Sequence, residues 1–254
     1  MGVNVDPDRP NDPGWPEDLE AQRARFRGYA EIAGLGWFER LYAEAVTGSA
    51  RVPWDLGHPD PLLADWLVGW QPSSSEFGGR PRALVVGCGL GRDAEFVAEL
   101  GFETTAFDIS ETAIRSAQRR FPESEVSYQV ADLLDPPPSW TRGYDLVVEC
   151  ITVQALPESL RPSAIHNVAR MVGDNGSLIV IALRQPTNHE PASGPPWPLT
   201  RPEIDAFATD GLEPVRIEQA IDPTYAGRRE RWRAAYHRPL GQPRPGPVRP
   251  KGAQ

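Results

Sequence analysis

The sequence is nearly devoid of lysine. Its 254 residues contain one, Lys251, in a Pro-, Arg- and Gly-rich C-terminal segment. Pyridoxal-phosphate enzymes, P-loop nucleotide hydrolases and Tyr-x-x-x-Lys reductases all need a lysine inside a packed site. The sequence therefore disfavours these three classes.

Cysteine, long apolar runs and excess basic charge are also lacking. The two cysteines, Cys88 and Cys150, lie in apolar contexts, which predicts buried thiols in a reducing compartment rather than a disulfide. No apolar run reaches membrane-spanning length and no signal peptide is visible, so we expect a cytoplasmic protein without membrane contacts. The net charge of −9 argues against nucleic-acid binding, and no zinc-ligand pattern appears, so no metal is predicted.

Composition divides the chain into three parts. Residues 1–16 are polar and Pro-rich and are expected to be disordered, and residues 241–254 are expected to form a flexible Pro-rich tail. Residues 17–240 are expected to form one domain. Its first part, 17–70, has helical apolar spacing, broken near Gly34–Gly36, and its helices are predicted to form a lid.

Strand-like and helix-like segments alternate after this lid. The strands are expected at 83–87, 103–108, 126–131, 144–150 and 176–183. The helices are expected at 92–100, from the N-cap Ser110 onward, and at 158–171. This alternation predicts a parallel sheet with helices on both faces.

The C-terminal part of the domain breaks the alternation. A long irregular insertion at 185–198 precedes a helix with a capping box of Thr200 and Glu203. Two strands, 214–221 and 229–237, then follow without a helix between them, so one is expected to be antiparallel. Alternating arginines and aromatic residues in 229–237 favour a half-buried edge strand with a polar face over a nucleic-acid surface.

A glycine-rich loop, "VVGCGLG" at 85–91, follows the first of these strands. Its G-x-G-x-G spacing differs from the G-x-G-x-x-G of dinucleotide sites, and Gly-Lys-Ser/Thr of a P-loop is absent. The helix that follows carries Asp93 and Glu95 in its first turn, where they would repel a pyrophosphate. The loop therefore suits a ligand without phosphate.

Two further carboxylates fall at the same edge of the predicted sheet. Asp108 ends the second strand, where it can accept the hydroxyls of an unphosphorylated ribose. Asp132 follows the third strand, where it can accept from an adenine amino group. A ribose, an adenine and a phosphate-free remainder are the parts of S-adenosyl-L-methionine, which is the predicted cofactor.

Four segments together resemble the class I S-adenosylmethionine-dependent methyltransferases. These are "VVGCGLG" at 85–91, "FDIS" at 107–110, "ADLL" at 131–134 and "YDLVVECITVQAL" at 144–156. "VPWDLGHPDP" and "GPPWPLTRPEIDAF" resemble the thiopurine-methyltransferase-like, small-molecule branch. The resemblance implies an α/β fold with a Rossmann-like, doubly wound, seven-stranded, mostly parallel sheet whose final strand is reversed, plus N-terminal helices.

The resemblance and the residue pattern together give a predicted site. The cofactor-binding residues are expected to be Trp54, Gly87, Cys88, Gly89, Gly91, Asp108, Ile109, Asp132, Leu133 and Glu149. The substrate pocket is expected to include Trp54, Cys150, Ile151, Gln154 and Trp197. His58 and Glu149 are the predicted catalytic residues, chosen from the possible bases His58, Asp60, Glu149 and His189.

Several of these residues have a second interpretation. Glu149 fits either a cofactor contact or a solvated strand end. Trp54 and Trp197 fit either the wall of a lid or a cover over the core. Cys88 is better explained as a small buried filler than as a nucleophile, because no paired base is visible.

The predicted reaction is in-line methyl transfer to a small-molecule acceptor through a sulfur, nitrogen or oxygen nucleophile. Two alternatives stay open. One is a non-catalytic cofactor-binding module of the same fold, and the other is an aminopropyltransferase that uses the same pocket.

Overall fold

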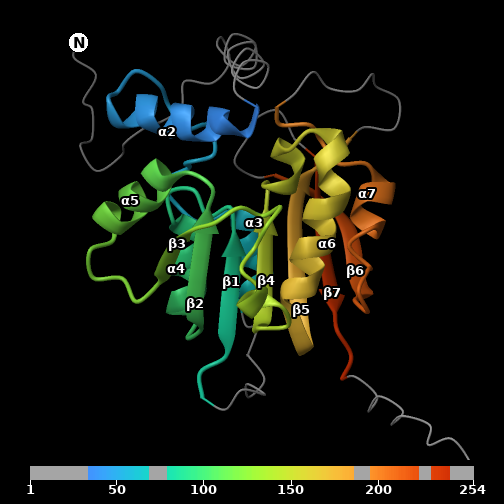
Figure 1. Cartoon of the computed structure of the whole chain (residues 1–254). Helices are drawn as coiled ribbons and strands as arrows, with labels where there is room; N and C mark the ends of the chain where they lie inside the picture. The colour runs from blue at the N-terminus through green and yellow to red at the C-terminus, as the bar shows by residue number, and fades with distance from the viewer. Residues whose placement is uncertain (1–33, 69–78, 186–194, 223–229, 241–254) are drawn as a thin grey trace, which may run out of the picture.

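The computed structural model describes residues 34–68, 79–185, 195–222 and 230–240. The predictions for 1–16, for 241–254 and for His189 lie outside these residues. The described part is an α/β fold built on one seven-stranded sheet of order β3-β2-β1-β4-β5-β7-β6 (Figure 1). The strands are β1 (Arg82–Val86), β2 (Glu103–Asp108), β3 (Ser127–Val130), β4 (Tyr144–Cys150), β5 (Val172–Leu183), β6 (Glu213–Ile221) and β7 (Glu230–His237).

The strand directions confirm the predicted topology. The pairs β1–β2, β1–β4, β2–β3 and β4–β5 are parallel, whereas β7 is antiparallel to both β5 and β6. One predicted detail is wrong: β7 is not an edge strand, because it lies between β5 and β6. Both Arg231 and Trp232 on it are therefore buried, and β6 forms the edge instead.

The helices begin and end close to the predicted residues. The described α-helices are α2 (Trp37–Val46), α3 (Pro61–Leu67), α4 (Arg92–Glu99), α5 (Glu111–Arg120), α6 (Arg161–Met171) and α7 (Arg201–Asp205). Ser110 caps α5 by accepting from the N–H of Ala113, and Thr200 and Glu203 form the predicted capping box of α7. None of the described helices has the length and hydropathy that a membrane span requires.

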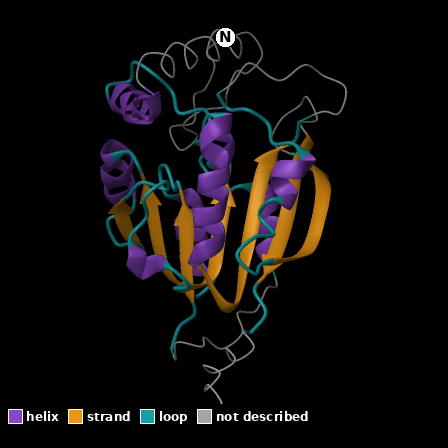
Figure 2. Cartoon of the chain, turned by 45° about the vertical axis from the view of Figure 1, so that its right-hand side comes forward, coloured by secondary structure: helices purple, strands orange, loops and turns teal. Residues whose placement is uncertain are grey.

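The core has a part on each face of the sheet. On one face, Leu84, Val86 and Val147 pack with residues of α6 and α7. On the other, Val85 and Val148 pack with residues of α3 and α4. Adjacent residues of β1 and β4 enter opposite parts because strand side chains alternate. Figure 2 shows helices against the twisted sheet and the N-terminal helix above the ends of its strands.

Two polar contacts hold the N-terminal segment, residues 34–60, against the sheet domain. Glu39 on α2 accepts hydrogen bonds from the hydroxyl groups of Ser110 and Thr112 at the start of α5. At the other end of α5, Arg120 donates two hydrogen bonds to Asp55, at 2.9 and 2.8 Å. The segment thus lies across α5, above the carboxyl ends of the strands (Figure 1).

A buried ion cluster joins the same segment to the far side of the sheet. Nη1 of Arg231, at the start of β7, lies 2.7 Å from Asp60 and 2.9 Å from Asp222. All three side chains are buried. Asp60 is also the N-cap of α3 and accepts from the N–H groups of Leu62 and Leu63. The cluster therefore fixes the position of α3, β7 and the end of β6 relative to one another.

Replacing Arg231 by methionine should lower the free energy of unfolding by about 3–5 kcal/mol, because the carboxylate of Asp60 then remains buried without this cation. Urea unfolding at pH 7 measures the loss. The control is Arg115→Met, which breaks the exposed pair with Glu111 on α5 and should cost less than about 1 kcal/mol. Equal losses in the two variants would show that the cluster does not hold these elements together.

Candidate functional site

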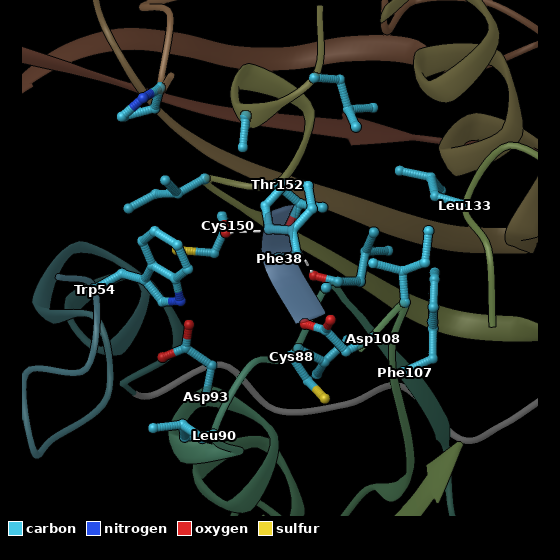
Figure 3. A pocket seen from close by; sticks show the side chains of 18 of the residues that line it. Phe38, Trp54, Cys88, Leu90, Asp93, Phe107, Asp108, Leu133, Cys150 and Thr152 are labelled. Atoms are coloured by element: carbon cyan, nitrogen blue, oxygen red, sulfur yellow. Dashed lines mark hydrogen bonds between the residues drawn. The ribbon is translucent and has the colours of Figure 1, made fainter. Parts of the chain in front are cut away.

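A pocket lies at the carboxyl ends of β1, β2 and β4, beneath the N-terminal segment. This is the edge at which parallel α/β sheets bind ligands. Figure 3 shows Trp54, Asp93 and Asp108 around its central space. The predicted residues that line it are Trp54, His58, Gly87, Cys88, Asp108, Ile109, Asp132, Leu133, Cys150 and Ile151.

Asp108 joins the glycine-rich loop to the start of α5. Its Oδ2 accepts from the N–H of Gly89 at 3.0 Å, and its Oδ1 accepts from the N–H of Ser110 at 2.9 Å. A carboxylate has about four acceptor positions, so both oxygens keep capacity for ligand hydroxyls. Burial raises the pKa of Asp108 to about 6, against the lowering effect of these hydrogen bonds.

The glycines of the loop allow side chains from other elements to approach closely. Gly89 has φ +52°, and a Cβ there would lie 2.8 Å from the hydroxyl oxygen of Tyr42. Gly91 has φ +90°, and its Cβ would collide with the hydroxyl group of Tyr128. Neither glycine is among the pocket-lining residues. Both glycines therefore leave room for side chains of the protein itself, whereas the sequence had predicted that they bind the cofactor.

Aromatic residues of the N-terminal segment form the roof of the pocket. Trp54 donates a hydrogen bond from Nε1 to the hydroxyl oxygen of Tyr42 at 2.9 Å. Trp37 and Phe38 stack with ring centroids 4.0 Å apart, and all four residues line the pocket. The sequence had singled out Trp54 only. Phe38 and Tyr42 are four residues apart on α2, and that spacing is the signal that could have placed both on one face of the helix.

A second carboxylate, Asp93, lies at the start of α4 on another wall. Its Oδ1 accepts from the N–H of Asp60 at 2.7 Å. Burial and the neighbouring charge of Asp60 raise the pKa of Asp93 to about 6, while Arg231 lowers it. Arg231 itself also lines the pocket, so the buried ion cluster extends to this wall.

Besides Gly89 and Gly91, three predicted residues lie outside the lining of the pocket: Glu149, Gln154 and Trp197. Glu149 is fully buried, so the interpretation as a solvated strand end is wrong. Gln154 is also buried, and its side-chain oxygen accepts from the N–H of Leu183 at 2.6 Å. The ring of Trp197 lies 5.9 Å from the guanidinium of Arg161, and the neighbouring Pro196 lines the pocket instead.

Both cysteines are free thiols, as predicted, but they are half-buried rather than fully buried, and both line the pocket. Burial raises the pKa of each thiol well above its usual value, and Asp108 raises that of Cys88 further. A nucleophilic cysteine needs the opposite shift. The described residues contain no cluster of His, Cys, Asp and Glu side chains that could hold a metal ion.

The chain is similar in sequence to known methyltransferases. Residues 83–176 match a family model described as a methyltransferase domain. The chain is 26% identical to a probable thiol methyltransferase 2 of Arabidopsis thaliana over 218 residues, which are 83% of this chain and 89% of that protein. It is 27% identical to thiocyanate methyltransferase 1 of the same plant, over 78% of this chain and 84% of that protein.

The fold also matches solved structures. The N-methyltransferase NodS from Bradyrhizobium japonicum, in complex with S-adenosyl-L-homocysteine, superposes with a TM-score of 0.58 at 22% identity. The match covers 80% of this chain and 96% of that one.

The contact of Gly89 with the roof can be tested by a double-mutant cycle. Gly89→Ala should destabilise the protein, because alanine is strained at φ +52° and its Cβ meets Tyr42. Tyr42→Phe removes the oxygen that it meets. The double variant should be more stable than the sum of the two single losses by at least about 0.5 kcal/mol, measured by urea unfolding. Strictly additive losses of unfolding free energy would mean that Tyr42 does not contact the loop at Gly89.

The raised pKa of Asp93 predicts a pH-dependent stability difference. Between pH 4 and 6 the folded protein binds more protons at this site than the unfolded chain does. The contribution of Asp93 to the free energy of unfolding therefore falls as the pH rises through this range. Relative to wild type, Asp93→Asn should therefore gain stability from pH 4 to 6 and change little above that. Urea unfolding of the ligand-free protein at intervals of one pH unit gives this difference, and a flat difference would contradict the raised pKa.

Proposed function

Because this chain is a class I S-adenosylmethionine-dependent methyltransferase, we propose that it methylates the sulfur atom of a small, uncharged thiol. The observation that carries the proposal is the charge and polarity of the pocket lining. The cationic cofactor requires carboxyl groups nearby, whereas the acceptor requires an apolar wall. The pocket lining contains both.

The residues present fit S-adenosyl-L-methionine. The lining includes five carboxyl groups, of Asp55, Asp60, Asp93, Asp108 and Asp132, and two guanidinium groups, of Arg92 and Arg231. Such a surplus of negative charge attracts a cationic sulfonium. We propose that Asp108 and Ile109 hold the ribose and that Asp132 and Leu133 hold the adenine, since these residues lie at the ends of β2 and β3.

When bound, this cofactor supplies an electrophilic methyl group on a positively charged sulfur. The residues of the chain position the cofactor and exclude water. The glycine-rich loop and Asp108 fix the position of the ligand, and the aromatic roof excludes water from the reacting atoms. The face of Trp54, whose orientation is held by Tyr42, also offers a favourable surface to a cation.

The acceptor side of the pocket is apolar. We define it as Phe38, Ile151, Ala155, Leu156 and Pro196, which are apolar residues of the pocket lining. A thiol suits this wall because its transfer from water is cheap, and it gives up its proton more readily than an alcohol does: the unperturbed pKa of a cysteine thiol, for example, is about 8.5. A permanently charged anion such as thiocyanate is less suitable, because the carboxylates of the lining repel it.

His58 is the proposed proton acceptor for the thiol. Its Nδ1 lies 2.7 Å from the carbonyl oxygen of Pro59, which can only accept, so Nδ1 carries the proton. In the neutral ring, Nε2 is then the accepting nitrogen. The side chain lines the pocket from an exposed position, so protons can pass from it to solvent.

A methyl-transfer assay with an acceptor panel tests the proposal. The panel holds hydrogen sulfide, an alkyl thiol, an aryl thiol, thiocyanate, iodide, a heterocyclic amine and a phenol, with product identified by mass spectrometry. We expect kcat/KM for a thiol to exceed that for thiocyanate at least about tenfold, which corresponds to about 1.4 kcal/mol of discrimination. Trp54→Ala should lower kcat/KM for the thiol. Trp66→Ala on α3, outside the pocket lining, should leave it unchanged.

Binding gives a separate control. Asp108→Ala should weaken the binding of S-adenosyl-L-homocysteine about 30- to 150-fold in calorimetry, because it removes charge-assisted hydrogen bonds. Turnover of amines, phenols or thiocyanate in preference to every thiol would refute the proposed acceptor. Tight cofactor binding with no acceptor turned over would favour the non-catalytic alternative instead.

A further inference from the structure

We propose that Glu149 is a positioning residue, whose buried carboxylate holds the turn after β4 and so the wall between the glycine-rich loop and the acceptor side. The inference deepens the proposed function and rests on it. It replaces the prediction, made from the sequence, that Glu149 is a catalytic residue in contact with ligands.

The carboxylate is bonded to the turn and not to the pocket. Oε1 accepts from the N–H of Thr152 and from the N–H of Val153, each at 2.8 Å. The side chain is 0% exposed and is not part of the pocket lining. The N–H groups of such a turn have no strand partner, so Glu149 satisfies two donors that would otherwise be buried without one.

The turn needs this support because its backbone is strained. Ile151 has φ +66°, the left-handed region, which a β-branched residue adopts only when its surroundings impose it. Its own N–H donates to the carbonyl oxygen of Ile181 at 2.9 Å, and its side chain lines the pocket. Contacts on both sides of Ile151 therefore hold it in this conformation.

Thr152 connects the same turn to the glycine-rich loop. Its hydroxyl group donates to the carbonyl oxygen of Val86 at 3.0 Å, and it fills the space in which a Cβ on Gly87 would lie. Loss of the Glu149 hydrogen bonds would thus move Ile151 on the acceptor side and Thr152 beside the loop together.

The other carboxylate oxygen, Oε2, has no hydrogen-bond partner among the described residues. Burial raises the pKa of Glu149 to about 7, opposed by the two N–H donors and by the charge of Arg231. Positioning needs only Oε1 as an acceptor, and glutamine supplies one. Replacing Oε2 by an amide group removes no hydrogen bond seen in the structure. A proton-transfer role, in contrast, needs the carboxyl group itself.

The experiment compares Glu149→Gln, Glu149→Ala and a control, Tyr236→Phe. The control removes the buried hydrogen bond from the Tyr236 hydroxyl group to Ile204, away from the pocket. Three quantities are measured: hydrogen exchange of the Thr152 and Val153 amides, calorimetric binding of S-adenosyl-L-homocysteine, and kcat, KM and their pH profile with the best acceptor. The first two do not depend on which acceptor is methylated.

In Glu149→Ala we expect exchange of the two amides to speed up at least about tenfold and kcat per folded molecule to fall about 10- to 100-fold. In Glu149→Gln we expect protection, kcat within about threefold of wild type and an unchanged pH profile. Loss of activity in Glu149→Gln with the amides still protected, or loss of the acidic limb of the pH profile, would overturn the proposal in favour of acid–base catalysis. Unchanged kcat per folded molecule in Glu149→Ala, the result expected of the control Tyr236→Phe, would overturn it in favour of a purely structural role.

Discussion

The buried pairing of Arg231 with Asp60 and Asp222 is the interaction on which the rest of the structure depends. It joins a residue of β7 to a loop 171 positions earlier in the chain. A buried guanidinium is tolerable only with such partners, because desolvation of an unpaired charge costs several kcal/mol. Asp60 in turn caps α3 and donates its N–H to Asp93 at the start of α4. One ion cluster thus connects the far side of the sheet to a wall of the pocket.

The pocket is made where this framework meets the N-terminal segment. Glu39 and Asp55 bind opposite ends of α5, and between them Tyr42 and Trp54 lie over Gly89. The glycine-rich loop therefore has two functions. It lines the pocket at Gly87 and Cys88, and it accommodates side chains of the roof at Gly89. Since the same loop contributes to both, the position of the roof and that of this wall of the pocket are set together.

Burial gives the carboxyl groups of this region different properties. Asp93 and Asp108 have pKa values raised to about 6, and the fully enclosed Glu149 has one raised to about 7. All three accept backbone N–H bonds, which partly offset the cost of desolvation. Asp108 remains available to a ligand because it lies at the pocket surface, whereas Glu149 is occupied by the turn. Their similar positions at strand ends conceal this difference in the sequence.

The sequence by itself determined the approximate bounds of most strands and helices, the glycine-rich loop and the position of Asp108 at the end of β2, because local periodicity, glycine spacing and N-caps are read from neighbouring residues. Only the tertiary structure decided that β7 is internal, that Phe38 and Tyr42 reach the pocket, and that Arg231, Asp60 and Asp222 meet. It likewise decided that Glu149 faces a turn and Trp197 a guanidinium. The physical reason is that each of these contacts joins residues brought together by strand pairing or by the docking of the N-terminal segment, and no local pattern specifies which distant partner a side chain will meet.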